Sequence, residues 1–172
     1  DTLATESRRL KRLLPDTPEP DYYLAKQAIA GIPKRSDYKK EEAEKIQQTL
    51  GPIVATCTVA INSLSERKND KFAEVLLNGV KLLLADAYRR LWWASDYSWD
   101  NPNRELALST LRHIPADSKQ AADMRLSILR DCNSQWFRWW RNDPKMRDID
   151  GHSITAKNLQ DEIQQLEQQC AK

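Results

Sequence analysis

The chain has 172 residues, 40% hydrophobic and 30% charged, which is typical of one globular domain and excludes a disordered segment. Only 4 glycines are present, which argues against a turn-rich β fold and phosphate-binding glycine loops, and the lack of an apolar run of about 18 residues excludes a transmembrane helix. The formal net charge of +2 excludes a chain that is basic overall, so a nucleic-acid surface would have to be local.

The N-terminal part is expected to form two short helices. Leucines at positions 3, 10, 13 and 14 predict the first helix, and the prolines at 15, 18 and 20 end it and form a stiff linker. A second helix is expected over residues 21–30, where Gly31 and Pro33 close it. The start of the chain, DTLATESRRLKRLL, has neither the apolar core of a signal peptide nor an initiator methionine. We therefore expect a soluble protein, a processed form or a fragment, with the cytoplasm slightly favoured.

Three helices are predicted for the middle of the chain. Ser36 or Asp37 caps the first, which runs to about Leu50, and Gly51-Pro52 separates it from the next. Asn69 or Asp70 caps the third and longest helix, which reaches about Ser95 and precedes an aromatic, polar loop over residues 96–102.

Three more helices are predicted after that loop. Asn101 caps a short helix to His113, and Asp117 caps a long helix to about Asn142. Ser153 caps the last helix, whose apolar positions step by 4, 3 and 4 residues: Leu159, Ile163, Leu166 and Cys170. This narrow seam is suited either to packing on the domain or to pairing with another helix.

A weak internal repeat links two parts of the chain. Leu24-Ala25, followed by Ile32-Pro33 and Ser36, matches Leu106-Ala107, followed by Ile114-Pro115 and Ser118, at an offset of 82 residues. This pattern resembles the second half of a tetratricopeptide repeat, although the offset is not a multiple of the 34-residue period of that family. The resemblance implies stacked helical hairpins.

Six tryptophans are the most unusual feature of the composition, and five lie near the ends of the two longest helices. At about 100° per residue, Trp136, Trp139 and Trp140 fall on the apolar side of their helix, whereas Arg130, Arg138 and Arg141 fall on the opposite side. The segregation favours a core role for these tryptophans. It leaves the three arginines as a solvated face or as a phosphate-binding face for RNA or DNA.

The longest helix carries a second apolar stripe. Val75, Leu82 and Trp93 lie off the main apolar arc, which runs from Phe72 to Leu91. Such a helix either is central in its domain or presents one stripe to a partner. We therefore predict a partner-binding site at four apolar residues: Val75, Leu82, Trp93 and Trp99.

The chain shows little that points to catalysis. Cys57, Cys132, Cys170 and the two histidines lack zinc-ligand spacing, and no catalytic triad or phosphate loop is present, so we expect no cofactor, metal or enzymatic activity. One weak alternative is the pair Arg147 and His152, which resembles the Arg-x4-6-His motif of the helical HEPN ribonucleases. That resemblance implies acid-base chemistry by His152 and phosphate stabilisation by Arg147.

The sequence therefore predicts an all-α protein of about seven helices, packed as stacked hairpins or as an irregular bundle. We expect an N-terminal helix and linker over residues 1–20, a helical core over 21–150 and an amphipathic helix over 151–172. The favoured function is a non-enzymatic protein-interaction domain, either a scaffold or adaptor or a self-associating assembly subunit. Nucleic-acid binding through the arginines, and less readily a ribonuclease, are the alternatives.

Overall fold

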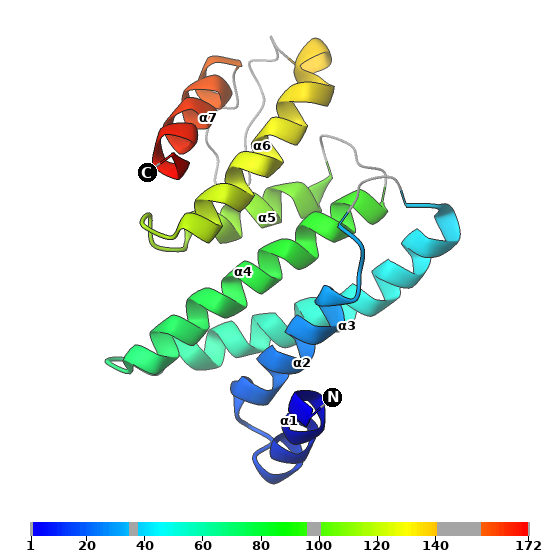
Figure 1. The fold of residues 1–172 in the computed structure, drawn as a ribbon, viewed down its shortest axis with the longest axis vertical. Helices are drawn as coiled ribbons and strands as arrows, with labels where there is room; N and C mark the ends of the chain where they lie inside the picture. Colours follow the sequence, from blue (N-terminus) through cyan, green and yellow to red (C-terminus); the bar gives the residue numbers. More distant parts are fainter. Residues whose placement is uncertain (1, 35–37, 96–100, 141–155, 172) are drawn as a thin grey trace.

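In a computed structural model, the described part of the chain forms seven α-helices and no strand (Figure 1). The description covers residues 2–34, 38–95, 101–140 and 156–171, with the backbone alone for residues 132–140 and 156. The helices are α1 (Thr2–Leu13), α2 (Pro18–Ala30), α3 (Lys40–Ser65), α4 (Lys71–Ala94), α5 (Pro102–Arg112), α6 (Lys119–Trp140) and α7 (Ala156–Cys170). The predicted all-α class is confirmed.

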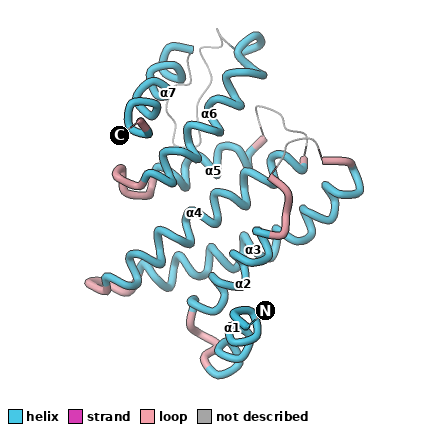
Figure 2. Tube along the Cα trace, in the orientation of Figure 1, coloured by secondary structure: helices cyan, strands magenta, loops and turns pink. Residues whose placement is uncertain are grey.

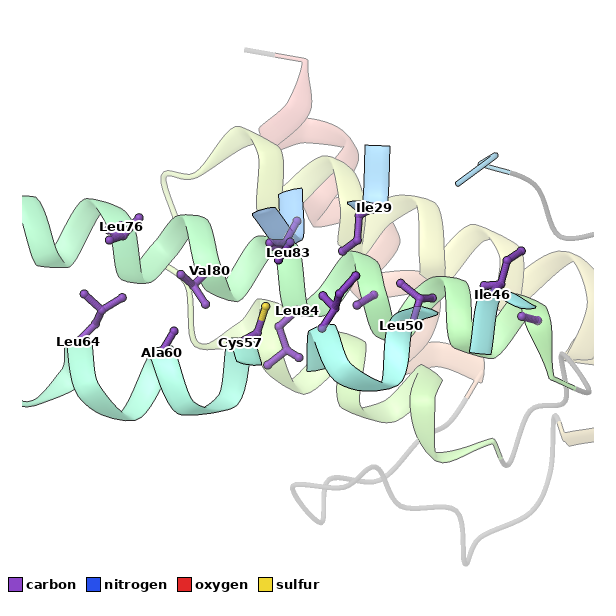
Figure 3. Packing of buried hydrophobic residues seen from close by; sticks show 14 of the residues in the cluster. Ile29, Ile46, Leu50, Cys57, Ala60, Leu64, Leu76, Val80, Leu83 and Leu84 are labelled. Carbon is purple, nitrogen blue, oxygen red and sulfur yellow. The ribbon is translucent and has the colours of Figure 1, made fainter. Parts of the chain in front are cut away.

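The α3–α4 pair is an antiparallel hairpin with an apolar seam along its whole length. On α3 the buried residues step alternately by four and three: Ile46, Leu50, Ile53, Cys57, Ala60 and Leu64. The buried residues of α4 follow the same spacing over Ala73, Leu76, Val80, Leu83 and Ala87. Figure 3 shows Leu64 beside Leu76 and Ala60 beside Val80. This 3-4 spacing keeps one face of each helix toward its partner, as in coiled coils.

The predicted break at Gly51-Pro52 is wrong, because both residues lie inside the continuous helix α3. Proline removes one backbone hydrogen bond and costs about 3 kcal/mol inside a helix. Each buried apolar side chain contributes about 1.5–3 kcal/mol, and the stripe continues past the proline with Ile53, Cys57 and Leu64. Pro52 itself lies on the exposed side of α3, so its ring does not disturb the seam.

Short turns join α1 to α2 and α3 to α4 (Figure 2). At the start of α4, a carboxylate oxygen of Asp70 accepts hydrogen bonds from the backbone N–H groups of Phe72, at 2.9 Å, and Ala73, at 3.1 Å. Asp70 is therefore the cap, whereas Asn69 makes the turn with a φ of 65°. Asparagine tolerates this left-handed conformation better than most residues.

Helix α2 packs against α3 and α4 and begins earlier than expected. Pro18 and Pro20 lie in its first turn, where a missing N–H group costs nothing, so they belong to the helix and not to a linker. The Tyr22 hydroxyl would lie only 3.0 Å from a side chain added at Gly79, so glycine allows this close approach to α4. The buried guanidinium of Arg90 donates to Asp86 and to the Ile32 carbonyl, which ties α4 to the end of α2.

Helices α5, α6 and α7 form a second core with the remaining side of α4. Its members include Trp92 and Trp93 of α4, Leu111 of α5, Ile128 of α6 and Leu166 of α7. Within the described residues, Ser118 and not Asp117 caps α6, because the Ser118 hydroxyl accepts from the Ala121 N–H at 3.4 Å. The seam of α7 packs on the domain, with Leu159 and Leu166 buried.

The two copies of the internal repeat have similar local structure. Ala25 and Ala107 are both buried, and the residues four positions later, Ile29 and Leu111, are buried too. Each copy is a short helix that ends at an Ile-Pro pair and is followed by a longer helix. The tetratricopeptide resemblance itself stays a prediction.

Candidate functional site

The predicted apolar stripe of α4 is not one exposed surface. Trp93 is only 8% exposed, and Leu82 is half-buried against the second core. Val75, in contrast, is 72% exposed. At Leu82 and Trp93, α4 therefore behaves as a central helix whose side chains pack inside the domain. A polar residue in place of Trp93 is expected to destabilise the fold. Partner binding at Val75 stays a prediction.

Helix α6 covers the C-terminal half of this stripe. The Arg89 guanidinium lies 4.3 Å from the centre of the Trp93 ring and donates to Ser127 and Asp131 of α6. Burial raises the pKa of the Asp131 carboxyl above its usual value, and this effect outweighs the opposite influence of Arg89. The stripe is thus enclosed by the chain itself from Leu82 to Trp93.

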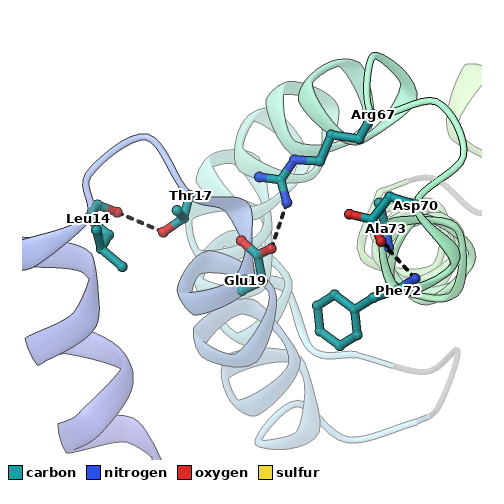
Figure 4. A network of polar contacts seen from close by, with 7 residues as sticks. All are labelled: Leu14, Thr17, Glu19, Arg67, Asp70, Phe72 and Ala73. Carbon is teal, nitrogen blue, oxygen red and sulfur yellow. Dashed lines mark hydrogen bonds and ion pairs between the residues drawn. The ribbon is translucent and has the colours of Figure 1, made fainter.

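Near the N-terminal end of α4 the stripe is exposed at Val75, and the neighbouring Phe72 is exposed too. Phe72 is 62% exposed, although its sequence position places it on the main apolar arc. Figure 4 shows Phe72 on the first turn of α4, in the same region as the ion pair in which the Glu19 carboxylate accepts a 2.8 Å hydrogen bond from Arg67. We call Phe72 and Val75 the α4 patch. No sequence pattern distinguishes Phe72 from its buried neighbours, because the difference depends on where the packed helices end.

A second exposed apolar surface lies on α1. Only Ala4 and Ser7 of this helix are buried, while Leu3, Leu10, Leu13 and Leu14 are exposed. Three of these leucines line a groove of about 350 Å³ between α1 and α2, and the other lining residues include Glu6, Glu19, Pro20 and Tyr23. We call the four leucines the α1 face. In the sequence these leucines predicted only a helix, although their spacing and the basic residues between them could have indicated a surface.

The predicted phosphate-binding arginines are only partly described. Arg130 is exposed and donates to the Glu167 carboxylate of α7 at 2.7 Å. Arg125, five residues earlier on α6, forms an ion pair with Glu162 of α7. The charge of Arg130 is therefore balanced within the chain. The side chains of Arg138 and Arg141 lie outside the described residues, so the three-arginine face stays a prediction.

Other predicted residues also fall outside the described residues. They are Trp99, assigned to the partner-binding site, and the ribonuclease-like pair Arg147 and His152. The same holds for the side chains of Trp136, Trp139 and Trp140, which were expected in the core. Their roles stay predictions.

Two observations on the described residues bear on metal binding and thiol chemistry. They contain no group of three His, Cys, Asp or Glu side chains that could hold a metal ion. Cys57 is buried in the seam between α3 and α4, where burial raises the pKa of its thiol to about 12 and so suppresses the nucleophilic thiolate. The exposed apolar surfaces are therefore the strongest candidates for function.

Comparison of the chain with protein-family models, curated proteins and solved structures gave no significant match. Among the described helices, none is long and apolar enough to cross a membrane.

Proposed function

We propose that the protein is a non-enzymatic helical adaptor that binds a protein partner through the α4 patch. The observation that carries the proposal is the uneven covering of one stripe. Its C-terminal half is enclosed by α6, whereas Val75 continues it as an exposed side chain. Phe72 of the main apolar arc is exposed three residues earlier on the same helix. Exposed aromatic and aliphatic residues that continue a buried stripe are suited to burial by a second molecule.

The surroundings of the patch favour a specific contact. Asp70 fixes the first turn of α4, and the Arg67–Glu19 ion pair ties the start of α2 to the α3–α4 turn. Phe72 and Val75 are therefore presented on a rigid helix, which lowers the ordering entropy lost on binding. Polar groups beside an apolar centre also match the usual composition of interfaces.

The test compares the double variant Phe72→Ser/Val75→Ser with the wild-type chain as immobilised bait for an extract of the source cells. Each protein captured by the wild type is then purified, and its affinity is measured by calorimetry. We expect at least tenfold weaker binding by the double variant with unchanged circular dichroism, because both side chains are exposed in the free protein.

Val59→Ser is the matched control, since Val59 is exposed to a similar degree but lies on α3. It is expected to bind as the wild type does. Equal capture by the wild type and the double variant would contradict the proposed site.

A further inference from the structure

The α1 face remains outside the proposed partner contact, and its arrangement points to a different ligand. At about 100° per residue, Leu3, Leu10 and Leu14 lie within about 40° of one another. Arg8, Arg9 and Arg12 lie on the opposite side of the same helix, within about 100°. An apolar row opposite a basic row is the pattern of helices that lie in a membrane interface.

The packing of α1 leaves both rows exposed at once. Helix α1 contacts α2 through a flank that holds Ala4 and Ser7, and Lys11 on that flank forms an ion pair with Asp21. The small size of Ala4 and Ser7 lets the two helices approach closely while the leucines project beside the contact. Helix α1 also lies at one end of the molecule, away from α5–α7 (Figure 1).

The charge of α1 complements an anionic surface. Helix α1 contains one acidic residue, Glu6, and four basic residues: Arg8, Arg9, Lys11 and Arg12. The formal charge of the helix is therefore +3. Arg9 lies 3.6 Å from Glu6 in an exposed pair that contributes little. Arg8 and Arg12 have no ion pair with any described residue. Near an anionic membrane, each such charge contributes by attraction to the headgroups.

From this geometry we infer that α1 docks on an anionic lipid surface, with the α1 face at the boundary between headgroups and acyl chains. A protein groove would cover the leucines but gain nothing from the arginines on the far side. A lipid surface engages both rows, because long arginine side chains reach along the helix flanks to the headgroups while the leucines enter the apolar region. Tyr23, which lines the groove and is exposed, adds an amphipathic ring to this surface.

The test is co-sedimentation of the full chain with vesicles of phosphatidylcholine, either pure or with about one third phosphatidylserine. We expect binding to the anionic vesicles to be at least tenfold tighter than to the neutral ones, and to weaken as salt rises. The double variants Leu10→Ser/Leu14→Ser and Arg8→Glu/Arg12→Glu are each expected to weaken it about tenfold or more. All four residues are exposed, so circular dichroism should show that both variants fold.

Lys40→Glu/Lys45→Glu is the matched control for the charge variant, because it reverses two exposed charges in the first part of α3, which lies away from α1 in Figure 1. It should bind as the wild type does. Absent binding to both vesicles, or equal losses in the variants and the control, would overturn the inference. A dimer in analytical ultracentrifugation that Leu10→Ser/Leu14→Ser abolishes, without vesicle binding, would assign the α1 face to a second copy and also overturn it. The variants leave the α4 patch intact, so this result is separable from partner capture.

Discussion

The adjacent helix pairs α3–α4 and α6–α7 differ in how much of their contact is apolar and how much is ionic. The α3–α4 pair has a continuous apolar seam, and its ends are joined by a short turn. The described part of the α6–α7 contact combines two buried leucines of α7 with polar links that include Arg125–Glu162 and Arg130–Glu167. Burial contributes far more free energy per contact than exposed ion pairs do, so we expect the first pair to be the stable centre of the fold.

The largest effect is expected from Leu50→Ala. Leu50 is fully buried in the α3 seam, so its truncation leaves a cavity and should lower the free energy of unfolding by about 4 kcal/mol. Chemical denaturation followed by circular dichroism measures this change. A loss below about 1 kcal/mol would show that the region around Pro52 is loosely packed and would break the comparison.

A smaller and more local effect is expected from Leu166→Ala. Leu166 is buried, but α7 is a single helix at the edge of the second core. We expect a loss of about 2 kcal/mol that appears mainly as faster amide hydrogen exchange across α7. If exchange in α3 accelerates equally, α7 does not open by itself and the two helix pairs are equally stable.

The smallest effect is expected from the exposed ion pair Arg130–Glu167. A double-mutant cycle with Arg130→Gln and Glu167→Gln should give a coupling of no more than about 1 kcal/mol, because water screens both groups. The coupling should fall further as salt rises. A coupling of about 3 kcal/mol would show that charge, and not the leucines, holds α7 in place.

The fold was largely predictable from local sequence patterns. Helical periodicity and the caps Asp70 and Asn101 located most helices, since a cap acts within three residues of itself. The errors arose where distant contacts outweighed local preference. Pro52 predicted a break, but α3 continues past it because the apolar residues on both sides of the proline pack against α4.

The candidate surfaces were less predictable, because exposure depends on which helix covers which. Val75 and Trp93 share a stripe in the sequence, but only the crossing of α6 separates an exposed valine from a buried tryptophan. The leucines of α1 similarly predicted a helix, but not which of its faces would be exposed. Only the packing through Ala4 and Ser7 shows that they point elsewhere.

Helix α4 has a further consequence for how the protein unfolds. It contributes Leu83 and Leu84 to the core with α2 and α3, and Trp92 and Trp93 to the core with α5–α7. Neither core is complete without this one helix, so their stabilities are coupled and both should melt in one cooperative transition. A fragment that ends at residue 95 would lack α5–α7, so one side of α4 would be uncovered and Trp92 and Trp93 would be exposed. We therefore expect that neither core folds by itself as a shorter chain.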